Sequence, residues 1–201
     1  MRAFIIDIIL AIGLVAALLL GSFSEFTQQC EEVQHSVLRL HIPANSDSDD
    51  DQRLKLELRD MLLKQYGSRL SECDSLEEAY IKAEQLLPEI DAAADLFLAE
   101  NGADYEATAE LVNMYFPTRK YESITLPAGS YDAIRVTLGK GNGQNWWCVM
   151  YPSLCLSAVS DELPEELMRE ENEALYPFLS DEPVQIEVKF ALFELIKKLF
   201  K

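Results

Sequence analysis

An uncharged, largely aliphatic run near the N-terminus limits, more than any other feature, what this chain can fold into. The thirteen residues from Ile8 to Leu20 follow a short basic start and precede small residues at Ser22 and Ser24. This order is typical of a secretory signal peptide. An uncleaved anchor over residues 4–23 is the alternative, because that stretch has roughly the length of one membrane span. We therefore expect a signal peptide or signal anchor at residues 1–24, followed by one extracytoplasmic domain at residues 25–201.

The charge balance of the chain is strongly acidic. Lys and Arg total 17 against 35 Asp and Glu, which gives a formal net charge of -18. Such a surface repels phosphate groups, so we expect no nucleic-acid partner, and it suits a protein that binds another protein, including a basic one. The hydrophobic fraction of 49% is enough for a packed core, and 201 residues suit one domain.

Hydrophobic periodicity divides the exported part into helices and strands. Alternation at residues 37–42 predicts a strand, and capping residues with apolar i,i+4 spacing predict the helices after it. The order of strand, helices and then strands predicts an α+β fold with a mainly antiparallel sheet, on which the helices of the N-terminal half pack. This domain follows the N-terminal hydrophobic export helix in the chain. The first predicted helix begins after a cap at Ser46 or Ser48 and ends at Gly67, and the second runs from a cap at Ser75 to Leu87. Further helices are predicted at residues 89–100, at 161–172 and in the tail from residue 192. The later predicted strands cover residues 105–113, 121–126, 134–138, 146–151 and 184–190.

Four cysteines suit an oxidising compartment and permit three pairings. Cys148 and Cys155, separated by six residues around a predicted turn, are the favoured disulfide, and buried free thiols are the alternative. A metal site is not expected, because no Cys-x-x-Cys is present and both histidines, His35 and His41, are more than a hundred positions away from this pair.

Two local patterns resemble ligand-binding loops and fail on their spacing. Asp47, Asp49 and Asp51 resemble the opening of a calcium loop, but Gly and Glu are missing at its sixth and twelfth positions, so they predict a solvated helix start. The loop of Gly139, Gly141 and Gly143 lacks both phosphate-loop patterns and lies between two predicted strands. It predicts a flexible hairpin connection or a contact loop, and the sequence predicts no cofactor and no small-molecule substrate.

No residue pattern predicts catalysis. A thiol hydrolase needs a thiolate beside a histidine, and nothing in the sequence places His41 next to Cys148 or Cys155. Ser130 does not stand in the Gly-x-Ser-x-Gly pattern of a nucleophile elbow. We therefore expect a protein that is not an enzyme, with an extracytoplasmic thiol hydrolase or a membrane-anchored adaptor protein as the alternatives.

The adjacent residues Trp146 and Trp147 are the clearest candidates for a binding surface. Neighbouring side chains of a strand point to opposite faces, so one indole can enter the core while the other stays outside. An exposed Trp is a common binding anchor, although large side chains of this kind are seldom fully exposed.

Two stretches of the chain resemble a known family. The first is LRLHIPANSD at residues 38–47, and the second includes LPAGSY at 126–131, GKG at 139–141, NWWC at 145–148 and PSLC at 152–155. Together they resemble stage II sporulation protein R of endospore-forming bacteria, over most of the chain after the export segment.

The resemblance implies an intercompartmental signal of endospore formation. Such a protein is secreted across the forespore membrane into the intermembrane space, or stays anchored by residues 4–23. There it activates a membrane-embedded aspartic protease of the mother cell, which processes the pro-sigma-E factor. This protease is the implied partner, and the chain also contacts the membrane during export. By analogy with exposed aromatic anchors, we expect the receptor contact at Trp146, Trp147 and the Gly139–Gly143 loop.

Overall fold

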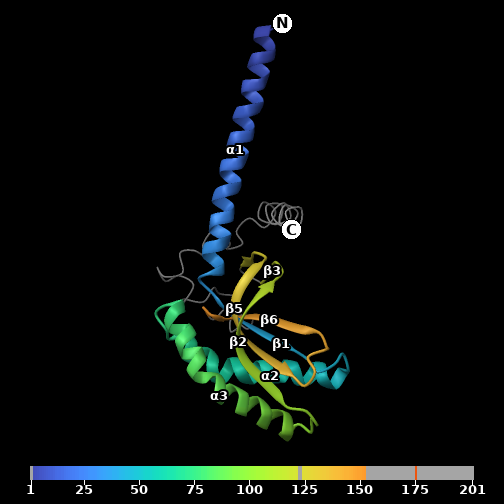
Figure 1. Ribbon diagram of the computed structural model, residues 1–201. Helices are drawn as coiled ribbons and strands as arrows, with labels where there is room; N and C mark the ends of the chain where they lie inside the picture. Colours follow the sequence, from blue (N-terminus) through green and yellow to red (C-terminus); the bar gives the residue numbers. More distant parts are fainter. Residues whose placement is uncertain (1, 122–123, 153–174, 176–201) are drawn as a thin grey trace.

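The computed structural model describes residues 2–121, 124–152 and 175 (Figure 1). A four-stranded sheet forms its centre, a two-stranded ribbon lies beside it, and two long helices follow the first strand. The elements in chain order are α1 (Arg2–Gln34), β1 (Leu38–Pro43), α2 (Asp49–Ser71), α3 (Leu76–Glu100), β2 (Ala107–Phe116), β3 (Arg119–Lys120), β4 (Thr125–Leu126), β5 (Gly129–Leu138) and β6 (Asn145–Tyr151).

The sheet is mixed, with strand order β2-β5-β1-β6. β2 pairs with β5 and β6 pairs with β1 in antiparallel fashion, whereas β1 and β5 are parallel. The α+β class is therefore confirmed, and the antiparallel expectation holds for two of these three pairs. The parallel pair forms because two helices and β2 separate β1 from β5, which is ample chain for a return in the same direction.

β1 lies between β5 and β6, so the prediction of a hairpin connection at Gly139–Gly143 is wrong. The loop instead crosses the end of β1 to carry the chain from one neighbour of that strand to the other. Sequence alone does not reveal such an insertion, because strands that follow each other in sequence are neighbours in only about two-thirds of cases.

The helices α2 and α3 cover one face of the sheet (Figure 1). Leu38, Leu40 and Ile42 of β1 point toward them, as the alternation of that strand predicts. The same core includes buried side chains from both helices and from β5 and β6: Leu54, Leu58, Leu62, Tyr66, Leu70, Leu86, Ile90, Leu98, Ile134, Val136, Cys148 and Met150.

Two helix boundaries differ from the sequence predictions. Ser48 caps α2 as expected, but the helix passes Gly67 and ends at Ser71, because buried Tyr66 and Leu70 anchor the turns on both sides of the glycine. Ser75 caps α3, and this helix continues through Pro88 instead of dividing there. A proline in a helix interior costs about 3 kcal/mol, and the core contacts of Leu86 and Ile90 on either side offset that cost.

The opposite face of the sheet carries a second, smaller core. The last turns of α1 supply Phe26, Cys30 and Val33, and Val37 comes from the segment between α1 and β1. These side chains pack with others of the sheet and of the β3–β4 ribbon. The segment predicted as one strand at residues 121–126 falls partly outside the described residues. Its described part contains the short strand β4, which pairs with β3 just before the segment. The predicted elements at 161–172, 184–190 and from residue 192 also lie outside them.

The N-terminal part of α1 extends away from the domain (Figure 1). Ile6, Leu10 and Leu14 are exposed along it. Within the part of the chain that the structure describes, no helix meets the length and hydropathy needed to cross a membrane. The hydrophobic export helix is accordingly not identified there, and the signal peptide or anchor at residues 1–24 stays a prediction.

Candidate functional site

The two adjacent tryptophans of β6 point to opposite faces of the sheet. Trp146 packs against the core under the helices, where the guanidinium carbon of Arg59 lies 4.2 Å from its ring centroid. Trp147 packs against the second core, with Arg119 at 5.7 Å from its ring. Both indoles are half-buried, so each has a contact inside the domain and an edge that solvent reaches.

Trp147 is part of an aromatic stack on the face away from α2 and α3. The imidazole of His41 lies parallel to the indole, with ring centroids 4.1 Å apart, and Phe116 meets the indole edge-on at 4.8 Å. The Nε2 atom of His41 is 2.9 Å from Oδ1 of Asn145. Burial lowers the pKa of His41, because a charged imidazolium would lose its hydration there.

Arg39 lies next to His41 on the same face and is completely buried. Its guanidinium carbon is 4.2 Å from the ring centroid of Phe116 and 4.9 Å from that of Tyr131, so the cation faces aromatic rings. The side chain also donates to the hydroxyl of Tyr121 and to the carbonyl oxygen of Cys148. Burial lowers the pKa of Arg39, and the Nη1 atom has no hydrogen-bond partner among the described residues.

The glycine loop between β5 and β6 is held against the segment that follows β1. The side-chain oxygen of Asn45 accepts a hydrogen bond from the backbone of Lys140, and the carbonyl of Ala44 accepts one from Gly143. Gly139 and Gly141 have φ of 52° and 61°, a region that other residues rarely adopt. The loop is thus a fixed platform, and its glycines serve its backbone geometry.

Asp51 ties this platform to the helices. Its carboxylate accepts hydrogen bonds from Asn45, Ser46 and the hydroxyl of Tyr105, at 3.0, 2.5 and 2.5 Å. Desolvation acts to raise the pKa of Asp51, but the hydrogen bonds outweigh it and hold that pKa below its ordinary value. The acidic residues at the start of α2 therefore serve in part to close the loop junction.

Cys148 and His41 lie on opposite faces of the sheet. The Cys148 side chain belongs to the core under the helices, whereas His41 stacks on Trp147 on the other face. This arrangement removes the geometric basis for a thiol hydrolase that pairs these two residues. Cys148 is bonded as a disulfide, and Cys73 is a free thiol. Cys155 lies outside the described residues, so its pairing with Cys148 stays a prediction.

Several residues of the site were not identified from the sequence. The alternation of β1 predicts that Arg39 and His41 share a face, but it gives no sign that this face is covered. Tyr105 was assigned only to the strand predicted at residues 105–113. Both Asn45 and Arg39 stand inside the string at residues 38–47, which is the one signal that pointed to them.

Comparison with known proteins gives a match over most of the chain. The sequence profile of the family described as Stage II sporulation protein R matches residues 34–161. This chain belongs to the stage II sporulation protein R family. The curated Stage II sporulation protein R of Bacillus subtilis (strain 168) is 35% identical over 210 residues, which cover 93% of this chain and 94% of that protein. No solved structure matches the chain.

The match of the family profile includes β1, the glycine loop and β6, where the site residues lie. Membership of the stage II sporulation protein R family supports a role in sporulation and a signalling protein in preference to an enzyme.

Proposed function

We propose that this protein is a secreted developmental signal of endospore formation. It crosses the forespore membrane into the intermembrane space and activates a membrane-embedded aspartic protease, which processes the pro-sigma-E factor in the mother cell. The observation that carries this proposal is family membership over residues 34–161, with 35% identity to the relative from Bacillus subtilis. The N-terminal segment acts as its signal peptide or remains as an anchor over residues 4–23.

The geometry of the site supports the proposal that this protein acts as the ligand of a receptor. A ligand acts by binding the active state of its receptor more tightly than the inactive state, which requires a well-defined surface. The glycine loop and β6 provide one, because Asn45 fixes the loop and the two tryptophans are held by Arg59 and by His41. We place the receptor contact on Trp146, Trp147 and the loop of Gly139, Gly141 and Gly143.

The experiment that tests this function is reconstitution in a vegetative, non-sporulating cell. The pro-sigma factor and its membrane protease are expressed with the full chain, or with a chain that lacks residues 1–24, and the processed sigma factor is detected by blotting. We expect processing only with the full chain. Absence of processing, with the protein exported and folded, contradicts the proposal.

A substitution at His41 separates the ligand from the thiol hydrolase within the same assay. His41→Phe removes any general base but keeps an aromatic ring that can stack on Trp147, so a ligand retains its activity and a hydrolase that uses His41 loses it. Trp146→Ala and Trp147→Ala test the contact surface. Full processing by both tryptophan variants, each folded, would show that the receptor binds elsewhere.

A further inference from the structure

A shallow groove lies where α3 ends and β2 begins. Its volume is about 540 Å³, and Leu96, Ala99 and Ala103 form its apolar floor. Leu96 is 60% exposed, the largest such value among the hydrophobic side chains of α2, α3 and the sheet in the described residues. An exposed apolar side chain in a hollow offers a partner surface that can be removed from water.

The rim of this groove is strongly negative. Asp104 and Glu106 line it, and Glu100 is exposed at the end of the adjoining helix. The last turn of α3 contains no basic residue, so the negative end of the helix dipole adds to these carboxylates. Within the described residues, the ion pairs use other carboxylates, and these three are left without a cation.

The frame of the groove is held in place by hydrogen bonds. Oδ1 of Asp95 accepts from the backbone of Ala107 at 2.7 Å, and Oδ1 of Asp91 accepts from Ala109 at the same distance. These bonds fasten the start of β2 to α3 and occupy two outward backbone donors of this strand. A partner strand therefore cannot add to β2 at these residues, and a partner that binds here contacts the groove instead.

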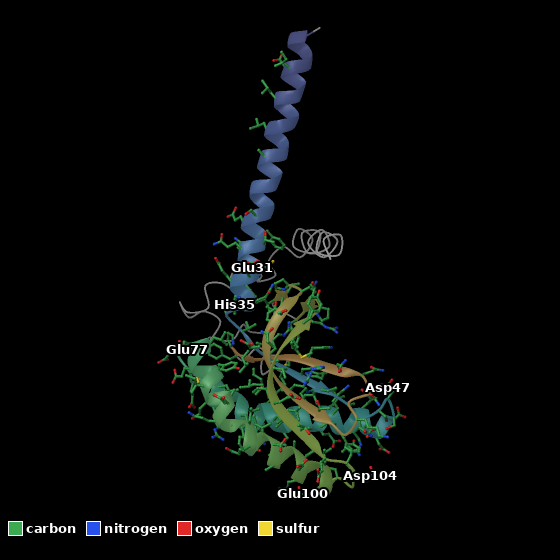
Figure 2. The ribbon with its side chains drawn as sticks, viewed as in Figure 1. Glu31, His35, Asp47, Glu77, Glu100 and Asp104 are labelled. Carbon is green, nitrogen blue, oxygen red and sulfur yellow. The ribbon has the colours of Figure 1, made fainter. Side chains whose placement is uncertain are left out.

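The groove borders the glycine loop. The amide of Gly139 donates to the carbonyl of Glu106 at 2.9 Å, and a Cβ on Gly139 would stand 3.0 Å from the ring of Tyr105. Figure 2 shows Asp47, Glu100 and Asp104 at the end of the domain away from His35, where α1 joins it. The groove and the loop thus belong to one end of the domain, which points away from the N-terminal helix.

We propose that this groove binds a basic, aliphatic segment of the receptor protease on its extracytoplasmic side. A Lys or Arg side chain of that segment meets Glu100, Asp104 and Glu106, and an aliphatic side chain covers Leu96. Charge complementarity of this kind raises the rate of encounter and selects the partner. The inference rests on the proposed function and adds the chemistry of the segment that the ligand recognises.

The test uses the full chain in the reconstituted cell. The groove variant carries Asp104→Lys and Glu106→Lys, and its matched control carries Glu72→Lys and Glu84→Lys, which change the net charge equally at exposed positions. A second variant, Leu96→Ser, removes the apolar floor, and Ile81→Ser, at 48% exposure on the same helix, is its control. Processing rates are compared at equal exported amounts, and co-precipitation of the chain with the protease reports binding.

We expect each groove variant to lower processing and co-precipitation about tenfold, which corresponds to about 1.4 kcal/mol of binding, while both controls stay within about twofold. Equal activity of groove variants and wild type overturns the inference and leaves the proposed function intact. An equal loss in both charge variants also overturns it, because net charge then acts without the groove. Failure of the wild type itself overturns the proposed function, and the inference with it.

Discussion

The imidazole of His41 lies parallel to the indole of Trp147, with an angle of 9° between the planes and 4.1 Å between the centroids. The two residues are register partners in the antiparallel pair of β1 and β6. Their stack therefore joins the strand at the centre of the sheet to the strand that carries the proposed receptor contact. Removing the imidazole would therefore remove a ring contact of Trp147.

The stability of the domain should depend on pH through His41. Burial holds the pKa of His41 in the folded state below 6.5, and Arg135 acts in the same direction. The unfolded chain then binds the proton more readily, so this contribution is complete above about pH 6.5 and is lost as the pH falls from there through the lowered folded pKa. Urea unfolding between about pH 7.5 and 5 should show this loss in the wild type and a smaller one in His41→Gln. Parallel pH profiles for the two proteins would contradict the prediction.

The stability of the domain should depend more on the volume of the Arg39 side chain than on its charge. The guanidinium is completely buried among aromatic rings, without an ion pair among the described contacts and with Nη1 unpaired. A buried cation without an ion pair carries an uncompensated desolvation cost, so an apolar side chain of similar length regains that cost while it loses the hydrogen bonds to Tyr121 and Cys148. Truncation in addition leaves a cavity. We expect Arg39→Met to stay within about 1 kcal/mol of the wild-type free energy of unfolding, and Arg39→Ala to lose about 3 kcal/mol. Denaturant unfolding measures both, and equal losses would show that the charge itself is required.

Local signals in the sequence predicted the parts of the fold that are decided locally. The caps at Ser48 and Ser75 and the inward face of β1 needed only a few neighbouring residues, and all are present. The continuation of α3 through Pro88 was missed, because packing against the sheet overrides a local helix breaker. The insertion of β1 between β5 and β6 was missed for a related reason, since it depends on pairing between distant segments.

In the candidate site, too, local features were predicted from the sequence, and features that depend on distant segments were not. The period of a strand predicted that Trp146 and Trp147 point to opposite faces, and they do. It also placed Arg39 and His41 on one face of β1, without any sign that this face is covered. The last turns of α1 and the β3–β4 ribbon help to form the small core on that face, and no pattern within β1 indicates what lies above it.

The glycine at position 143 should tolerate no larger side chain. A Cβ there would overlap the backbone carbonyl of Ser46, which the β1–α2 junction holds in place. Overpacking against backbone costs about 1–3 kcal/mol, and we expect Gly143→Ala to lose at least about 2 kcal/mol. Gly102→Ala is the control, because Gly102 has a φ of 77° but nothing within 4 Å of its Cβ, so only the backbone strain of about 1 kcal/mol remains. Equal thermal shifts in the two variants would mean that the close contact has no role.

The hydrogen bond from Tyr105 to Asp51 should couple the groove to the loop junction. The hydroxyl lies 2.5 Å from Oδ1 of Asp51, and burial together with this bond raises the pKa of Tyr105. A hydrogen bond to a charged acceptor contributes about 1.5–3 kcal/mol. We expect Tyr105→Phe to lose about 1.5 kcal/mol, and the double variant with Asp51→Asn to lose less than the sum of the single losses, because both substitutions remove the same bond. Ser71→Ala, whose hydroxyl bonds within α2, is a control that should add independently to Asp51→Asn. Additive losses for Tyr105→Phe and Asp51→Asn would show that the two groups stabilise the domain separately, and that the end of α3 is fastened to the loop junction by other contacts.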